Sequence, residues 1–435
     1  MYPQPHASST RTLLRLGLPL ALAAILLLLG LGLAAAQGPA RLTRITIALG
    51  SGHRYSSRPS LSGDGKRIAF LSDSDFLDQG IPAGQRDIWL YDTATMTFTR
   101  VTSGVRGSRR PAVNDHGTKV VFSSDNDFLG QGIPDNQFEI WLYDIDTKGL
   151  TRLTTAAGTG DRYSFNPSPN ANGTRVAFHS NSDFLGQGIP DDQFEIWPYD
   201  TATMTVTRVT NSGTGRDSRS PSISTDGTKI AFHSTGDFLG HGIPDDQREI
   251  WLYDTTTKKY TRVTTSGAER NSDYPSLDGD GTRVAFESDS DFLSQGIGSG
   301  EDEIWLYDLH HCWYTRISYT DHDNNRESWG PAISADGTRI AFDSDSDFLG
   351  YGNIGETQFE IWLYDTAAET LTRVTTASAD DRYSEYPSLN RDGSKIAFES
   401  DSDFLSQGVQ PGQYEIWLWE YLPGLYLPAV LRSGS

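Results

Sequence analysis

The chain has 435 residues, with 57 acidic and 36 lysine or arginine side chains and a formal net charge of −21. A protein this acidic repels phosphate backbones and anionic headgroups, which excludes nucleic acid and anionic membrane surfaces as general partners. Cys312 is the one cysteine, so an intramolecular disulfide is also excluded.

The first segment in chain order has the pattern of an export signal. Arg11 and Arg15 precede an apolar run over residues 16–33, and the alanines at 34–36 are small residues of the kind that signal peptidase cleaves after. An uncleaved membrane anchor is the alternative, because the run is nearly long enough to span a bilayer. We predict a signal peptide or N-terminal membrane anchor over 1–36 and an extracytoplasmic location, with membrane contact only through this segment if it is uncleaved.

A motif of about 55 residues then repeats seven times between Arg54 and Trp417. Each copy has a proline-containing segment, a turn with glycine, an apolar segment, a long polar loop, an Ile-Trp segment and a Thr-Arg segment. We assign four strands, a to d, to each copy. The sequence therefore predicts an all-β, seven-bladed β-propeller over residues 37–422, followed by a C-terminal tail over 423–435.

The composition of each strand predicts its place in a blade. Strand a contains a proline, which cannot donate to a sheet ladder, so we expect it at the inner edge, lining the channel. Strand d is expected at the outer edge, where its arginine discourages pairing with other molecules. Strand c is continuously apolar, as expected for a strand covered on both faces, and its tryptophans are predicted to form the core between blades: Trp89, Trp141, Trp197, Trp251, Trp305, Trp362 and Trp417.

The last copy lacks a strand d of its own. The segment Leu42–Thr46 aligns without gaps on strand d of the second copy, Leu150–Thr154. We therefore predict that the N-terminal strand completes the seventh blade and closes the ring.

The repeat also resembles a known family. The turn with glycine followed by Ile-Ala-Phe, then Glu-Ile-Trp-Leu-Tyr-Asp and Leu-Thr-Arg-Val-Thr, resembles the WD-like propeller repeats of the TolB type. The resemblance covers residues 41–421 and implies the propeller of an exported bacterial protein. The chain differs by its long loop between strands b and c and by lacking a region like the N-terminal domain of TolB, and fold similarity by itself does not transfer function.

Two charged positions are constant in all seven copies, an arginine before the turn glycine and an aspartate after it. We predict a structural clamp in which each arginine fork holds a loop carboxylate. The arginines are Arg54, Arg106, Arg162, Arg216, Arg270, Arg326 and Arg382, and the aspartates are Asp75, Asp127, Asp183, Asp237, Asp291, Asp347 and Asp403.

Metal sites are weakly indicated. Pairs such as Asp73 with Asp75 have the spacing of the first two ligands of a calcium loop, but the third acid and the early glycine are missing, so solvated turn residues are the alternative. His179 and His233 occupy equivalent strand-b positions of adjacent blades and are expected to be too far apart to share an ion. We assign no metal ligand and no catalytic residue.

The copies differ most just before the strand-a proline, at the expected channel mouth. An uneven set of arginines and aromatics there fits an anionic or glycan ligand, because guanidinium forks bind carboxylates and flat rings pack on sugar faces. Ordinary variable loop surface is the alternative. The predicted ligand-binding residues are Arg58, Arg109, Arg110, Phe165, Arg219, Tyr274, Trp329 and Tyr386.

From the sequence we expect an exported, monomeric binding module that takes a protein, or an anionic or glycan ligand, at this mouth, with no nucleic acid partner. One alternative is a propeller enzyme, a lyase or glycosidase, acting on acidic polysaccharide. A structural surface protein that uses its outer edges is another.

Overall fold

The computed structural model describes residues 40–48, 54–157, 161–319, 326–350, 354–355, 358–377 and 382–422. The predicted leader over 1–36 and tail over 423–435 lie outside these residues. Within them, we find no helix with the length and apolar character needed to cross a bilayer. Residues Leu42–Glu420 form the compact unit described below.

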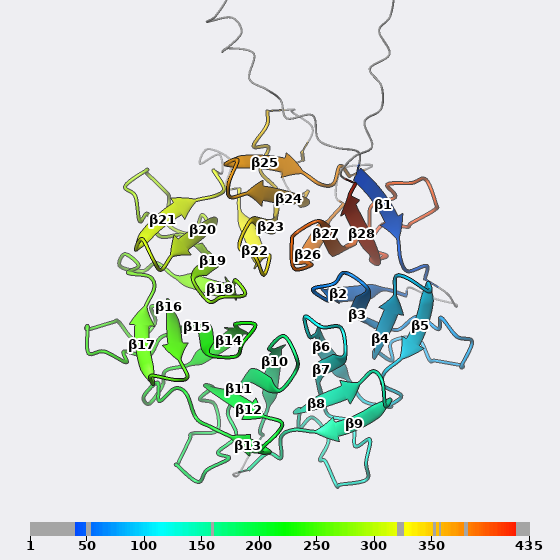
Figure 1. The fold of residues 1–435 in the computed structure, drawn as a ribbon, viewed down its shortest axis with the longest axis horizontal. Coiled ribbons are helices and arrows are strands. Elements are labelled where there is room, and N and C mark those ends of the chain that lie inside the picture. Colours follow the sequence, from blue (N-terminus) through cyan, green and yellow to red (C-terminus); the bar gives the residue numbers. More distant parts are fainter. Residues whose placement is uncertain are drawn as a thin grey trace, which may run out of the picture. The chain divides into compact units, whose positions relative to one another are not determined.

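This unit consists of seven four-stranded antiparallel sheets arranged around a central channel, which confirms the predicted seven-bladed propeller (Figure 1). Strands a are β2 (Ser56–Leu61), β6 (Ser108–Val113), β10 (Ser164–Pro169), β14 (Ser218–Ile223), β18 (Ser272–Leu277), β22 (Ser328–Ile333) and β26 (Ser384–Leu389). Strands b are β3 (Arg67–Ser72), β7 (Lys119–Ser124), β11 (Arg175–Ser180), β15 (Lys229–Ser234), β19 (Arg283–Ser288), β23 (Arg339–Ser344) and β27 (Lys395–Ser400).

Strands c are β4 (Asp87–Asp92), β8 (Glu139–Asp144), β12 (Glu195–Asp200), β16 (Glu249–Asp254), β20 (Glu303–Asp308), β24 (Glu360–Asp365) and β28 (Glu415–Tyr421). Strands d are β5 (Thr97–Arg100), β9 (Gly149–Arg152), β13 (Thr205–Val206), β17 (Lys259–Arg262), β21 (Trp313–Arg316), β25 (Thr370–Arg373) and, from the other end of the chain, β1 (Ala40–Arg44). Figure 1 shows strands a innermost and strands d outermost, as the proline and arginine positions predicted.

The ring is closed by β1, as the alignment predicted. The seventh sheet has the order β1-β28-β27-β26, so the N-terminal strand pairs with the last strand of the chain. Just after β1, the N–H of Ile45 donates to the carbonyl of Ile416 at 2.8 Å. Two segments far apart in the sequence therefore share one sheet.

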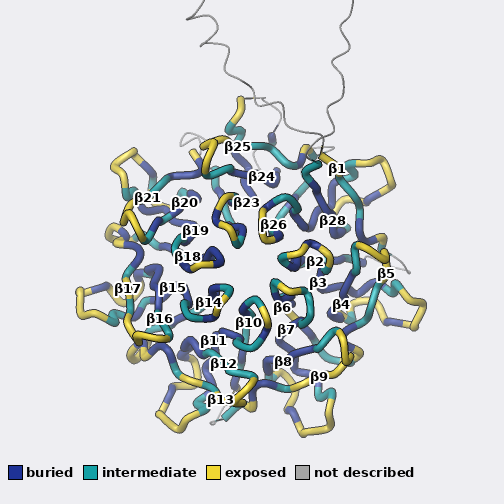
Figure 2. Tube along the Cα trace, viewed as in Figure 1, coloured by how far each residue is buried: buried dark blue, intermediate teal, exposed yellow. Residues whose placement is uncertain are grey.

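The core lies between neighbouring blades. The strand-c tryptophans are all fully buried, which confirms their predicted role. Between the first two blades, Ile88 and Leu90 of β4 pack with Phe122 of β7 and Trp141 of β8. Figure 2 shows the same division in every blade, with the buried residues in the middle of the sheets and exposed loops at the periphery.

A second, polar layer of the core was not predicted. Every strand c begins with a fully buried acid, and the strand-d arginine turns inward to pair with it: Asp87, Glu139, Glu195, Glu249, Glu303, Glu360 and Glu415 are paired with Arg100, Arg152, Arg208, Arg262, Arg316, Arg373 and Arg44. Six of these pairs have N–O distances of 2.6 to 2.8 Å. The arginine was expected to protect the outer edge, whereas it compensates a buried charge.

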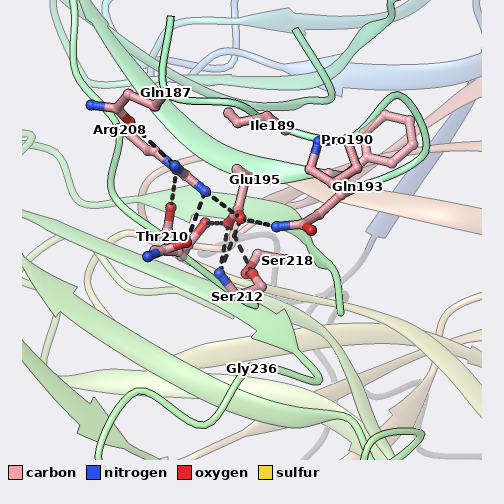
Figure 3. A network of polar contacts seen from close by, with 12 residues as sticks. Gln187, Ile189, Pro190, Gln193, Glu195, Arg208, Thr210, Ser212, Ser218 and Gly236 are labelled. Carbon is pink, nitrogen blue, oxygen red and sulfur yellow. Dashed lines mark hydrogen bonds and ion pairs between the residues drawn. The ribbon is translucent and has the colours of Figure 1, made fainter. Parts of the chain in front are cut away.

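Glu195 shows how completely each acid is bonded (Figure 3). Its carboxylate accepts from the Arg208 guanidinium at 2.8 Å, the Thr210 hydroxyl at 2.5 Å and the Gln193 amide at 2.6 Å. The N–H of Ser212 adds a further bond at 3.0 Å. A buried carboxylate needs such partners, and this one ties strand c to strand d and to the loop that follows.

Candidate functional site

The seven clamp arginines reach the long b–c loop of their own blade, but they bind its main chain. Each donates to the carbonyl nineteen residues further along the chain. Arg54, for example, donates to the carbonyls of Asp73 and Ile81, the latter at 3.0 Å. Three of the arginines also pair with a loop carboxylate, but with Asp135, Asp191 and Asp245 rather than the predicted aspartates.

The constant aspartates hold the same loop at other points. Asp75 accepts from the N–H groups of Gln79 at 2.8 Å and Gly80 at 2.6 Å, and five further copies repeat this pattern at Asp127, Asp183, Asp237, Asp291 and Asp403. The N–H donors lower the pKa of Asp127. The expected direct arginine–aspartate clamp is thus replaced by two separate sets of bonds, because the loop's own main-chain groups need partners.

The carboxylates with calcium-like spacing are also engaged by main-chain donors. Asp73 accepts from the N–H of Tyr55 at 2.9 Å and of Gly84 at 3.0 Å, and its neighbour Asp75 is bonded as described. Asp289 and Asp401 accept from equivalent N–H groups. Donors therefore occupy the oxygens that a cation would need, and this arrangement does not fit calcium.

A bulge in every strand a directs one residue into the channel. The residue before the proline has a positive φ between 45° and 60° in all seven copies, at Arg58, Arg110, Asn166, Ser220, Tyr274, Gly330 and Tyr386. The pairing of strands a and b shifts at the same place. These residues and the prolines line a central cavity of about 360 Å³, so four of the predicted ligand-binding residues, Arg58, Arg110, Tyr274 and Tyr386, meet there.

The strand-b residue beside each bulge changes character around the ring. In chain order the seven residues are Leu71, Ser123, His179, His233, Glu287, Asp343 and Glu399. In the last five, the side chain accepts the N–H of the bulge residue in the next blade, at distances of 2.5 to 3.4 Å. The first two blades therefore have neutral residues here, and the last three have acids.

Burial disfavours the charged form of the carboxyl groups on the acidic side. Burial raises the pKa of Glu399 to about 8, and it raises the pKa values of Glu287 and Asp343 well above their ordinary range. Burial, together with the nearby Asp289, raises the pKa of Asp302 to about 7. Negative charge on this side of the channel therefore grows as the pH rises through neutrality.

The neutral side carries a pocket rich in arginine, which we call the arginine pocket. It has a volume of about 530 Å³ between the first two blades, and Arg58, Arg86, Arg106, Arg109 and Arg110 are among its lining residues. Burial and Arg109 lower the pKa of Arg86, and burial and Arg58 lower that of Arg110. Like charges are thus held close together in a chain with a net charge of −21.

Aromatic rings lie against three of these arginines, with Arg86 at 4.5 Å from the ring centre of Tyr55. The Arg109 guanidinium carbon lies 4.7 Å from the ring centre of Phe138, and that of Arg58 lies 3.7 Å from the ring centre of Tyr386. Within the part of the chain that the structure describes, no carboxylate forms an ion pair with Arg86, Arg109 or Arg110. The charge of these three side chains is therefore available to a ligand.

The repeat supplies an internal comparison for this pocket. A rim pair, as we use the term, consists of two residues from neighbouring blades. The first directly precedes the buried acid of strand c in one blade, and the second lies two positions before the strand-a proline of the next blade. The seven rim pairs are Arg86/Arg109, Phe138/Phe165, Phe194/Arg219, Arg248/Asp273, Asp302/Trp329, Phe359/Glu385 and Tyr414/Ser57. In the fourth blade Arg248 is neutralised by Asp273 at 2.7 Å, whereas at the equivalent place Arg86 faces a second arginine.

The structure thus brings some predicted site residues together and separates others. Arg58, Arg109 and Arg110 share the arginine pocket, and Phe165 adjoins it through Phe138, at 5.1 Å between ring centres. Arg219 lines a different pocket of about 450 Å³, where it is paired with Asp217, and Tyr274 lines both this pocket and the central cavity. Trp329 is stacked on Phe359 with 4.8 Å between ring centres.

Arg86 and Phe138 were missed by the sequence analysis. They lie just before strand c, on a segment that looked like part of the constant motif. Their position is as uneven between copies as the predicted mouth positions, with Arg, Phe, Phe, Arg, Asp, Phe and Tyr in turn. That variation was the signal that could have found them.

No protein-family model and no curated protein matches the sequence. Solved structures do match the fold. An oligogalacturonate lyase from Vibrio parahaemolyticus is similar with a TM-score of 0.59 and 14% identity, over 89% of this chain and 99% of the other. An oligogalacturonate lyase in complex with manganese is similar with a TM-score of 0.56 and 14% identity, over 89% and 95%.

Propellers of the TolB type are also among the similar structures. The putative TolB from Agrobacterium tumefaciens matches with a TM-score of 0.41 and 18% identity, over 64% of this chain and 88% of that one. The likenesses to the two oligogalacturonate lyases show the propeller fold alone. The finer resemblance to a family of exported repeat proteins stays a prediction.

The manganese bound by one of these structures prompts a test of the residues here. The Nδ1 atom of His179 faces the N–H of Ser220 at 3.2 Å, and that of His233 faces the N–H of Tyr274 at 3.4 Å and Asp273 at 3.2 Å. Burial lowers the pKa values of both histidines, which are therefore neutral at pH 7. Among the described residues no group of three acids, histidines or cysteines is placed to hold an ion, so they do not fit a manganese site.

Proposed function

We propose that this protein is an exported propeller that binds an anionic ligand in the arginine pocket. The observation that supports the proposal is the Arg86/Arg109 rim pair with Arg110 beside it, three guanidinium groups that no carboxylate of the described chain neutralises. Side chains of like charge gain most from a bound anion, and a guanidinium fork suits a carboxylate. In the fourth-blade rim pair Arg248/Asp273, the carboxylate of Asp273 occupies the place that we assign to the bound anion.

The proposal predicts that Arg109→Asp prevents anions from binding in the arginine pocket. The new carboxylate would face Arg86 as Asp273 faces Arg248, and would take the place of the ligand. We expect the affinity for trigalacturonate, measured by isothermal titration calorimetry, to fall by about tenfold or more, the usual effect of losing a charge-assisted bond. Full methyl esterification of the trisaccharide, which removes its charge, should abolish binding to the parent protein.

The control is Arg391→Asp, which makes the same change in net charge at an exposed arginine paired with Asp115 on the side of the glycine turns. It should leave the affinity within about twofold, because long-range repulsion is screened at physiological salt. Equal losses in the two variants, or no binding of any carboxylate-bearing probe by the parent, would overturn the proposal.

A second candidate function is an enzyme that cleaves acidic polysaccharide. One observation favours it: Asp302, in the rim pair with Trp329, has a pKa near 7, as a general acid or base requires. The likeness to oligogalacturonate lyases is one of fold alone. Release of unsaturated or reducing sugar from polygalacturonate, lost in Asp302→Asn, would favour this candidate over a binding module.

A further inference from the structure

An aromatic surface adjoins the arginine pocket. Tyr163 and Phe165 are stacked, with 5.6 Å between ring centres and 11° between ring planes, and both remain partly exposed. We call these two residues the aromatic ledge. The ring centre of Phe138, which is 5% exposed, lies 5.1 Å from that of Phe165 and 4.7 Å from the Arg109 guanidinium carbon. One buried ring therefore fixes the distance between the ledge and the guanidinium group.

Phe165 is one of three residues that cover a rim phenylalanine. The other rim phenylalanines, Phe194 and Phe359, are each 8% exposed, covered by Arg219 at 4.1 Å and by Trp329 at 4.8 Å respectively. Phe165, at the same strand position as Arg219 and Trp329, covers Phe138 in the same way, and its own ring is stacked on Tyr163 while remaining partly exposed. An apolar face left partly open beside unpaired positive charge is suited to a ligand that has both characters.

We propose that the ligand is an acidic sugar whose carboxylate enters the arginine pocket and whose ring lies on the aromatic ledge. This inference rests on the proposed function and adds the class of ligand. A pyranose ring offers an apolar C–H face to aromatic rings and hydroxyl donors at its edge. Burial and the nearby carboxylate of the exposed Asp161 raise the pKa of Tyr163, so Asp161 lies beside the ledge, where it favours hydroxyl groups and disfavours a second anion.

The ligand therefore has one anionic group for each sugar ring, at a fixed distance from the ring face. A flexible acidic peptide carries carboxylates without such a face, and inorganic anions have no ring. Acidic peptides and inorganic anions should both bind in the arginine pocket without contacting the aromatic ledge. This difference separates the inference from the proposed function.

The test compares Phe165→Ala with the parent for two probes of equal charge, trigalacturonate and triglutamate, by isothermal titration calorimetry. We expect Phe165→Ala to lower the affinity for trigalacturonate by about fivefold to tenfold, which is the size of one aromatic contact. The affinity for triglutamate should stay within about twofold of the parent's. Phe165→Tyr, which keeps a flat ring, should restore the sugar affinity. Unchanged melting temperatures of both variants would show that the fold is intact.

The results distinguish a failure of this inference from a failure of the proposed function. If Phe165→Ala has no effect on the sugar while Arg109→Asp abolishes binding, the ledge is not used and only the anion proposal stands. If Phe165→Ala lowers the affinity for both probes equally, Phe165 supports the shape of the site and does not contact the sugar, and the inference is overturned. A nucleoside monophosphate bound more tightly than the sugar, with the same dependence on Phe165, would overturn it in favour of a base on the ledge.

Discussion

The buried acid at the start of strand c shows how one residue position connects two strands and a loop. Glu195 has no exposed surface, and five groups donate to its carboxylate, among them both the N–H and the hydroxyl of Ser212. Burying a charge in a sheet is unfavourable unless partners of this kind surround it. With them, the same residue fixes the position of Arg208 and the course of the chain after Thr210.

Replacing this acid should therefore destabilise its blade. Glu195→Ala leaves the Arg208 guanidinium and the Thr210 hydroxyl without their acceptor, and breaking a buried pair in this way costs about 3–5 kcal/mol of unfolding free energy. Chemical denaturation followed by tryptophan fluorescence measures the loss. The exposed neighbour Asp192 provides the control, since Asp192→Ala should change stability by about 0.5 kcal/mol or less. Similar stabilities for the two variants would contradict this account.

At this scale the sequence predicts residue types better than partners. Arg109 and Arg110 were predicted as ligand-binding residues because the copies differ there, and both line the arginine pocket. Arg54 was correctly placed at the loop, but its carbonyl partners follow from loop geometry that composition does not encode. The variation at the Arg86 position could have singled that residue out, but its place beside Arg109 follows only from the docking of neighbouring blades.

At the scale of elements, β1 has the largest consequence for its size. It supplies the outer strand of the seventh sheet, and with it Arg44 and Thr46, which donate to the buried Glu415. All the strands, this one included, could be predicted from the repeat, because a motif copied seven times averages out the ambiguity of any one copy. The short bulge in strand a could not, since a positive φ before proline leaves no compositional signal.

Removing β1 should cost far more stability than removing an ordinary terminus. A chain beginning at residue 48 leaves Glu415 buried without its arginine, a loss of about 3–5 kcal/mol before the missing strand contacts are added. We expect a melting temperature lower by about 10 °C or more, measured by differential scanning calorimetry. A chain beginning at residue 38 retains β1 and serves as the control. Equal melting of the two chains would refute closure by this strand.

At the scale of the whole molecule, the channel has two chemically different sides. Its first two blades present neutral strand-b residues and the arginine pocket, and its last three present the buried acids Glu287, Asp343 and Glu399. Neither side stands out in the composition, because the average over seven copies conceals their order around the ring. The order becomes visible only when equivalent positions of the copies are compared one by one.

The buried acids on one side of the channel predict how the free energy of unfolding depends on pH. The ordinary glutamate pKa is 4.5, and in the fold that of Glu399 is about 8. Between these values the unfolded chain has lost the proton that the folded chain still holds, so rising pH favours unfolding, by up to about 1.4 kcal/mol per pH unit for this group. Glu399→Gln cannot lose a proton, so relative to the parent it should gain stability from pH 5 to pH 8 in denaturation experiments.

The comparison needs an acid outside the channel. Glu369 is exposed in the turn between β24 and β25, and Glu369→Gln should follow the parent at both pH values. A constant difference between Glu399→Gln and the parent across this range would show that Glu399 is ionised throughout, contrary to the effect of its burial.

The bulge before each proline has an evolutionary consequence. Because main-chain geometry alone turns this residue inward, arginine, asparagine, serine, tyrosine and glycine all occupy the position in one ring. A single codon change in one copy can therefore introduce a new functional group at the axis while the other six copies keep the framework intact. Selectivity in such a protein can diverge by point mutation, without inserted loops and without rebuilding a fold.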